Sequence, residues 1–293
     1  MKPVAIDLDH IGTVIRNLDH AEAAFEKLGF QLTPRSYHRG AAAPGGPIEE
    51  WGSANRCAML SQGYLEVLGI VDDSKFSSAQ ALVAKYEGPH IVAFRPASAE
   101  AVQQLTDAGL PVDVERKLER MIPFGVAGTE SRRVAFRNMR FSTSTFPEAQ
   151  FQYTEHLTRD VMWQPHLLEH PNGALALDCV YLCSPEPAAT ATRLAPVLGI
   201  DPRIPRSDEF VFDLSASSLC VLGPQAWGTR SSEPPRHPLP APVGYAVRTA
   251  SIRQAEAVLT RNQVPYTSYR DGLFVGPSHA CGNVIHFIER KSS

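Results

Sequence analysis

Residues 8–30 read LDHIGTVIRNLDHAEAAFEKLGF, and the same succession of residue types returns at residues 88–110, GPHIVAFRPASAEAVQQLTDAGL. Aligned without a gap, the two stretches place His10 on His90. Each stretch has an apolar run typical of a strand, a polar break, and an Ala- and Leu-rich run typical of a helix. Each helical run ends at a glycine, which suits the left-handed end of a helix. The chain therefore contains a repeated strand–helix unit.

Two fainter copies of this unit follow in the second half of the chain, at residues 177–199 and 243–266. Each of the four copies is followed by a β-rich stretch with a distinctive last strand; these last strands are residues 63–69, 151–156, 218–223 and 283–289. We therefore expect an α+β fold built from four strand–helix–three-strand (βαβββ) modules, paired into two cupped barrels. The first pair is predicted to span residues 1–163 and the second residues 174–293, with the Pro- and His-containing stretch 164–173 as a linker.

Composition excludes several classes of protein. The chain has 293 residues, of which 43% are hydrophobic and 20% charged, with 28 Lys and Arg against 31 Asp and Glu. A net charge of −3 argues against a protein that binds nucleic acid by neutralising phosphates. No apolar run approaches the roughly 18 residues that a membrane-spanning helix needs. The five scattered cysteines and the absence of a secretory leader predict a cytoplasmic protein without a disulfide framework.

Four polar residues interrupt apolar rows at corresponding places in the first two modules. Strand alternation puts His10 and His90 in the apolar rows of the first strands, and Glu66 and Glu155 in those of the last strands. Such groups are costly inside an apolar barrel unless something satisfies them. A divalent metal would do so, since imidazole and carboxylate suit zinc, iron, manganese, cobalt or nickel.

The opening stretch 8–30, together with Asn55 and the segment GYLEVLG at 63–69, resembles the glyoxalase-like members of the vicinal oxygen chelate superfamily. That superfamily also includes bleomycin resistance proteins and extradiol dioxygenases. The resemblance covers residues 4–160 and extends more weakly over the remainder as a second pair of modules. It implies a cup of paired βαβββ modules around a metal, with ligands from the first and last strands of each module.

Carried over by position, the resemblance implies one divalent metal (Zn, Mn, Ni, Co or Fe) held by His10, Glu66, His90 and Glu155. His10, His90 and Glu155 would form the minimal set of two histidines and one carboxylate. Glu66 would be either a fourth ligand or the base. The carboxylate that binding does not need, Glu66 or Glu155, is the expected catalytic residue because it could move protons.

Other polar residues are candidates for substrate contact. Tyr64 and Tyr153 would flank the metal, and His38 could reach the pocket from a loop. His156 follows Glu155 on its strand and is expected to point outward. The Arg-rich stretch 116–140 is interpreted as a solvated hairpin in preference to an anion site.

The second half departs from the ligand pattern. Cys179 stands in the place of His10 and Cys220 in the place of Glu66. Val243 or Gly244 replaces His90, while His286 lies near the position of Glu155. A soft Cys/Cys/His site is one interpretation; the preferred one is a degenerate pair of modules that packs and closes, since small buried cysteines are common in cores.

These observations favour a metal-dependent lyase or isomerase acting on a small substrate with two adjacent oxygens, such as an α-hydroxycarbonyl. The metal would act as a Lewis acid. The alternatives are a ferrous extradiol-type dioxygenase and a metal-free small-molecule-binding protein of the resistance type. The expected partner is a small molecule, neither nucleic acid nor membrane, and a homodimer is left as an option.

Overall fold

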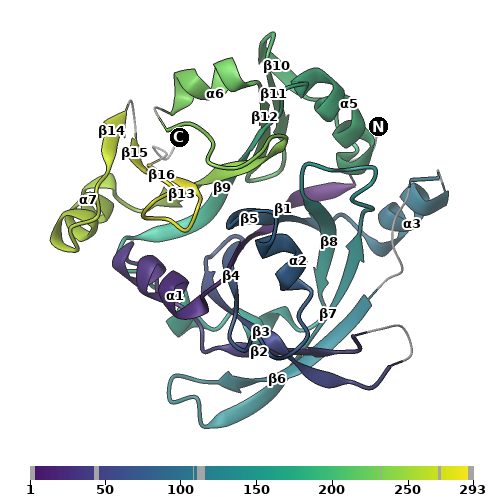
Figure 1. Ribbon diagram of the computed structural model, residues 1–293, viewed down its shortest axis with the longest axis vertical. Coiled ribbons are helices and arrows are strands. Elements are labelled where there is room, and N and C mark those ends of the chain that lie inside the picture. The colour runs from purple at the N-terminus through teal and green to yellow at the C-terminus, as the bar shows by residue number, and fades with distance from the viewer. Residues whose placement is uncertain are drawn as a thin grey trace.

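The computed structural model describes residues 4–42, 46–107, 109–110, 116–231, 233–269 and 272–289. Its strands form two eight-stranded mixed sheets, one in each half of the chain, and the N-terminal sheet curls into a nearly closed barrel (Figure 1). The expected α+β fold of paired modules is therefore confirmed. No helix among the described residues is long and apolar enough to cross a membrane.

The N-terminal sheet has the strand order β2-β3-β4-β1-β5-β8-β7-β6, so the first strands of two modules lie side by side at its centre. Its elements are, in order, β1 (Ala5–Ile15), α1 (Leu18–Lys27), β2 (Ser36–Gly40), β3 (Glu49–Met59), β4 (Tyr64–Ile70), α2 (Ala79–Val83), β5 (Gly88–Pro96), α3 (Ala99–Asp107), β6 (Arg116–Phe124), β7 (Glu130–Arg140) and β8 (Gln150–His156). Each module closes when its last strand pairs in parallel with its first, β4 with β1 and β8 with β5.

The C-terminal sheet repeats this arrangement in the order β10-β11-β12-β9-β13-β16-β15-β14. The short helices α4 (Arg159–Met162) and η1 (Pro165–Leu167) lead into it. Its elements are β9 (Ala174–Cys183), α5 (Pro187–Leu198), β10 (Arg203–Arg206), β11 (Glu209–Asp213), β12 (Ser218–Leu222), α6 (Pro224–Arg230), β13 (Ala241–Thr249), α7 (Ile252–Arg261), β14 (Thr267–Tyr269), β15 (Gly272–Val275) and β16 (Val284–Ile288).

Local sequence explains where the first module turns from strand to helix and back. Asn17 caps α1 because its side chain accepts a hydrogen bond from the backbone N–H of His20 at 3.1 Å. Gly29, just after the helix, has φ of +85°, a conformation that costs glycine little and other residues more. Between these ends α1 buries Leu18 and Phe25. The helix therefore begins and ends where the sequence signals place it.

One apolar core runs through both halves of the molecule. It contains side chains of β5 and β8 as well as side chains of β9 and α5. Phe30, after α1, stacks on Phe287 of β16 with ring centroids 5.9 Å apart. The connection between the sheets is itself buried: Asn172 is fully buried and donates from Nδ2 to the carbonyl oxygen of Leu28. The two sheets are thus packed as one body.

Candidate functional site

The N-terminal barrel encloses a cavity of about 230 Å³. Strands of both modules contribute to its wall, which combines aromatic, carboxylate, imidazole and guanidinium groups. Of the seven residues that the sequence marked as site residues, four line this cavity: His10, His38, Tyr64 and Glu66.

His10 reaches the cavity because β1 bulges beside it. Leu8 pairs with Phe94 and His10 pairs with Ala93, so Asp9 is left without a partner on β5. Such an extra residue breaks the alternation of side chains between the two faces of a strand. Leu8 consequently belongs to the apolar core, while His10 lines the cavity.

Asp9 fixes the orientation of the His10 ring. The Asp9 carboxylate accepts from His10 Nδ1 at 2.7 Å, and both its oxygens lie 3.1 Å from His156 Nε2. Burial alone would raise the pKa of Asp9, but the interaction with His156 and the hydrogen bonds from both rings outweigh it and hold the pKa below its usual range. An ionised carboxylate can only accept, so Nδ1 of His10 carries the proton. In the neutral ring, Nε2 is then left as an acceptor.

Glu66 stands opposite that acceptor. Its Oε2 lies 4.0 Å from His10 Nε2, and its Oε1 accepts a hydrogen bond from Asn55 Nδ2. The side chain is 13% exposed, so its free oxygen can meet a ligand from the cavity. Gly12 pairs with Glu66, and a Cβ there would lie 3.0 Å from Oε2. The glycine thus keeps space open beside the carboxylate.

His38 and Tyr64 complete the same part of the wall. The Tyr64 ring stacks on His10 with ring centroids 4.4 Å apart. His38 Nδ1 lies 2.9 Å from the Ser53 hydroxyl. Burial lowers the pKa of His38, with opposing influence from Glu66. Both residues are therefore in position to contact a ligand.

The structure does not bring His90 to the cavity. β5 bulges at His90, which has no partner on β1, while its neighbour Ile91 pairs with Gly12 and lines the cavity. The His90 ring instead stacks on Tyr86 at 3.9 Å, and its Nε2 lies 2.9 Å from the Tyr86 carbonyl oxygen. Burial lowers the pKa of His90 to about 4.

Glu155 and Tyr153 point away from the cavity as well. Glu155 forms an ion pair with Arg137, whose Nε lies 2.7 Å from Oε2. Tyr153 is fully buried in the core shared by the two halves, and its hydroxyl donates to the carbonyl oxygen of Val197. On this strand Gln152 lines the cavity, and so does His156, contrary to the expected outward direction of that histidine.

The strand pairing shows which residues of the second module correspond to His10 and Glu66. His10 pairs with Ala93 and Gly12 with Ile91, so exchanging the two antiparallel strands converts His10 into Ile91. The gap-free alignment that matched His10 with His90 is therefore displaced by one residue.

The closing strands show the same kind of displacement. In the first module Gly12 pairs with Glu66, and in the second module Ala93, which corresponds to Gly12, pairs with Gln152. Gln152, and not Glu155, is consequently the counterpart of Glu66. The second module presents an isoleucine and an amide where the first presents an imidazole and a carboxylate.

This donor set does not fit the divalent metal that the resemblance implies. Catalytic zinc sites use three protein ligands, and non-haem iron sites use two histidines and a carboxylate. Of the four predicted ligands only His10 and Glu66 meet. In the part of the chain that the structure describes, no three His, Cys, Asp or Glu side chains are grouped so that they could hold a metal ion.

Sequence reasoning missed Asp9, His156 and Asn55, which hold the two central groups in place. One signal was present: the Leu-Asp pair at residues 8–9 returns at 177–178. β9 also bulges at Asp178, because Cys179 pairs with Ala246 and Leu177 with Val247. The repeated pair marks the bulge in both halves.

The C-terminal sheet fills the corresponding space with side chains. Cys179 and Cys220 occupy the places of His10 and Glu66, with their sulfur atoms 3.2 Å apart as free thiols. His286 occupies the place of Gln152 and lies 3.0 Å from the Tyr181 hydroxyl. Trp227 of α6 is buried in the same cluster. Side chains of the C-terminal half thus pack together at the positions that correspond to His10, Glu66 and Gln152.

The chain belongs to the family described as glyoxalase-like domain, whose sequence model matches residues 8–198. The predicted resemblance is thereby confirmed, and the fold is that of the vicinal oxygen chelate superfamily. No curated protein sequence matches the chain.

Solved structures share the fold over its whole length. A hypothetical protein from Staphylococcus aureus has a TM-score of 0.63 at 12% identity, covering 97% of this chain and 99% of that one. A mutant of 4-hydroxymandelate synthase from Streptomyces coelicolor has a TM-score of 0.60 at 12% identity, covering 99% and 94%. A xylose isomerase-like TIM barrel/4-hydroxyphenylpyruvate dioxygenase fusion protein has a TM-score of 0.58 at 10% identity, covering 99% of this chain and 49% of that one.

Proposed function

We propose that this protein is an enzyme of the isomerase or lyase type that moves protons on a small substrate with two adjacent oxygens, and that it does so without a resident metal. The observation that carries the proposal is that His10 Nε2 and Glu66 Oε2 face each other at the cavity wall, 4.0 Å apart. The other nitrogen of His10, Nδ1, is hydrogen-bonded to Asp9, and the other oxygen of Glu66, Oε1, accepts from Asn55. Two acceptors held in this way suit general acid–base chemistry.

An α-hydroxycarbonyl makes use of both groups. The Glu66 carboxylate takes the proton from the carbon that bears the hydroxyl and returns it to the neighbouring carbon. His10 Nε2 takes the hydroxyl proton and delivers it to the former carbonyl oxygen. The ionised Asp9 stabilises the imidazolium formed in between. The hydroxyl and carbonyl thus exchange places, and no atom or electron is gained or lost.

A metal-dependent lyase, isomerase or ferrous dioxygenase would need a third donor beside His10 and Glu66, and the described residues place none in a group with them. The metal-free binding protein remains the competing function, because the aromatic wall contributed by Tyr64, Trp51 and Phe136 would also hold an apolar ligand. In that case His10 and Glu66 would only form hydrogen bonds to the ligand.

The test is deuterium incorporation from D₂O, followed by proton NMR, with chelator-treated protein. Three probes share the α-hydroxycarbonyl group: dihydroxyacetone, hydroxypyruvate and dihydroxyacetone phosphate. We expect incorporation above the protein-free rate for at least one probe, and a loss of roughly 10²- to 10⁴-fold in Glu66→Gln, the usual range for a general base.

Glu155→Gln is the matched control, because it makes the same change in a carboxylate that points away from the cavity. It should leave incorporation unchanged. A probe that binds without deuterium incorporation would show that the protein is a binding protein and not this enzyme. Incorporation that disappears on chelation and returns with one added metal would show that the reaction depends on a metal.

A further inference from the structure

One wall of the cavity is strongly basic. Four arginines line it: Arg39 of β2, Arg116 and Arg120 of β6, and Arg140 of β7. They lie on the cavity side of the Arg-rich hairpin, because alternate residues of each strand share a face. Most of β6 is exposed, as expected of a solvated hairpin, while Arg120 on its cavity side is half-buried.

Carboxylates are fewer than guanidinium groups among the described residues that line the cavity. Two of these residues are acidic, Glu66 and Glu119. Glu119 lies 2.8 Å from the Nη1 of Arg133, which is 62% exposed. Glu66 is held by Asn55 and faces His10. Neither carboxylate is therefore shown in contact with Arg120.

Arg120 is the guanidinium best placed to bind an anionic group of a ligand. It lies 5.2 Å from the centroid of the Phe136 ring, and its Nε is buried without a hydrogen-bond partner among the described residues. A buried donor left unsatisfied costs about 1–3 kcal/mol. A ligand oxygen that accepted from Nε would remove this cost.

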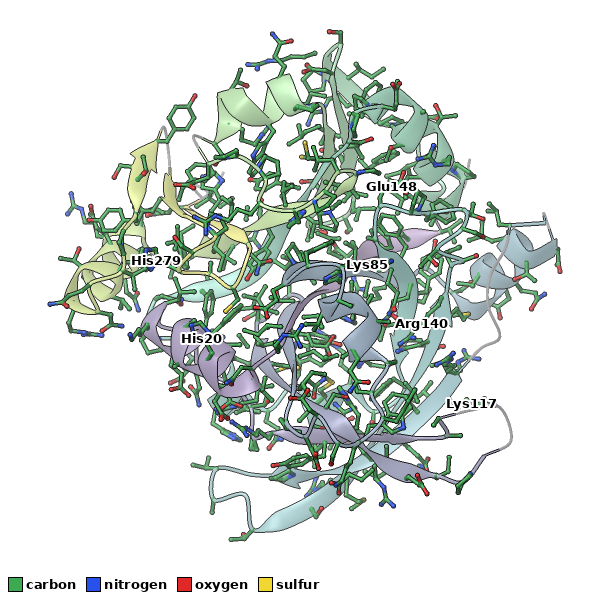
Figure 2. All side chains as sticks on the ribbon, in the orientation of Figure 1. His20, Lys85, Lys117, Arg140, Glu148 and His279 are labelled. Atoms are coloured by element: carbon green, nitrogen blue, oxygen red, sulfur yellow. The ribbon has the colours of Figure 1, made fainter. Side chains whose placement is uncertain are left out.

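Arg140 of β7 lines the same cavity. Arg120 and Arg140 both lower the pKa of His38, after the larger effect of burial, and Glu66 opposes them. Both cations therefore lie near the imidazole that lines the cavity. Arg140 pairs with Gln152, one of the residues of β8 that line the cavity. Figure 2 shows Arg140 on the N-terminal barrel.

We infer that the substrate of this site carries an anionic oxygen group, and that Arg120 binds it while His10 and Glu66 move protons on the adjacent hydroxyl and carbonyl carbons and oxygens. The inference rests on the proposed function and narrows its substrate class to acidic α-hydroxycarbonyls. A guanidinium presents two parallel N–H groups that match the oxygens of a carboxylate or a phosphate. Arg120 thus provides the specificity that the acid–base pair lacks.

The same three probes test the charge directly, since they differ in the group attached to a common hydroxyacetyl unit. Hydroxypyruvate carries a carboxylate, dihydroxyacetone phosphate a phosphate ester, and dihydroxyacetone a neutral hydroxymethyl group. Binding to the full-length protein is measured by titration at constant ionic strength. We expect at least one of the two anionic probes to bind at least tenfold more tightly than dihydroxyacetone. The tighter of the two identifies the anion as carboxylate or phosphate.

Arg120→Gln should bring the anionic probes to within threefold of dihydroxyacetone, and Arg120→Lys should keep only part of the preference because lysine lacks the planar fork. Arg203→Gln is the control for net charge, because Arg203 is exposed on the C-terminal sheet and pairs with Asp213. Three results would overturn the inference. They are equal binding of all three probes, no binding of any of them at 10 mM (about 2.7 kcal/mol of affinity), and a preference for the anionic probes that survives Arg120→Gln.

The inference and the proposed function fail in different ways. A preference for the anion that depends on Arg120, with no deuterium incorporation, would leave the anion site standing and remove the enzyme. If Glu66→Gln abolishes deuterium incorporation while Arg120→Gln changes neither binding nor rate, the enzyme would stand and the anion site would be refuted.

Discussion

At the scale of single residues, the bulge at Asp9 determines what His10 can do. Because Asp9 holds Nδ1–H, Nε2 is the acceptor that faces Glu66. In Asp9→Asn the amide can donate to Nδ1 and so favour the other tautomer, in which Nε2 carries the proton. We expect deuterium incorporation to fall by about 10²-fold, the lower range for loss of a general base, while the affinity for hydroxypyruvate changes little.

Nitrogen-15 NMR of the His10 ring measures the tautomer directly, which a merely structural role of Asp9 would not alter. Asp178→Asn is the control, since Asp178 is the bulge residue of β9 in the C-terminal sheet. A ring that keeps its proton on Nδ1 in Asp9→Asn would contradict this role.

A second imidazole, in the C-terminal sheet, affects stability in acid. His286 stacks on Phe274 at 3.9 Å and faces the Tyr181 hydroxyl. Burial, and then the charge of Arg230, lower its pKa to about 3. Below its ordinary pKa of about 6.5, the unfolded chain binds a proton that the folded protein refuses. The free energy of unfolding therefore falls as the pH decreases from 6.5 toward 3, by at most about 1.4 kcal/mol per pH unit from this group.

His286→Gln keeps an acceptor for Tyr181 and removes the titration. Urea unfolding at pH 7.0, 5.5 and 4.5 should show a smaller loss of stability in this variant than in the wild type. His90, whose pKa is also lowered, contributes equally to both proteins. Parallel stability profiles would show that His286 does not carry the effect.

At the scale of strands and helices, most of the fold follows from sequence periodicity. The four modules, the glycine that ends α1 and the four closing strands lie where the pattern predicts them. The site is harder to predict, because a period of two fails wherever a strand bulges. An unpaired residue at His90 is enough to bring Ile91 to the cavity. The sequence therefore identifies the strands that build the site but only half of its ligand positions.

This register predicts how a metal site could be built. Ile91→His together with Gln152→Glu would place an imidazole and a carboxylate opposite His10 and Glu66, at the positions that the strand pairing makes equivalent. We expect the double variant to bind Co²⁺ at least 100-fold more tightly than the wild type (about 2.7 kcal/mol), because four ligands replace two.

The visible absorption of Co²⁺ reports the coordination. His90→Ala, made in the double variant, should not weaken binding, since His90 contacts Tyr86 and not the cavity. Weaker binding in that triple variant, or equal binding by the wild type and the double variant, would refute the assigned register.

At the scale of the whole molecule, the two sheets depend on each other. The main-chain N–H of Leu177 donates to the carbonyl of Gln62, and Ser217 Oγ accepts from the N–H of Leu8. Tyr153, in the last strand of the first barrel, donates to Val197 of α5. The C-terminal half thus supports β1 and β8, the strands that carry His10 and Gln152.

We therefore expect the chain to unfold as one cooperative unit, although its sequence divides into two similar halves. Differential scanning calorimetry should give one transition whose calorimetric and van't Hoff enthalpies agree. A fragment of residues 1–163 would expose core side chains such as Phe30 and Tyr153, which pack against the other half. Exposure of each such aromatic costs about 1.5–3 kcal/mol, a large share of the stability of an ordinary domain. The fragment should consequently show no cooperative transition. Two separate transitions in the full chain, or a cooperative transition in the fragment, would show that the halves fold independently.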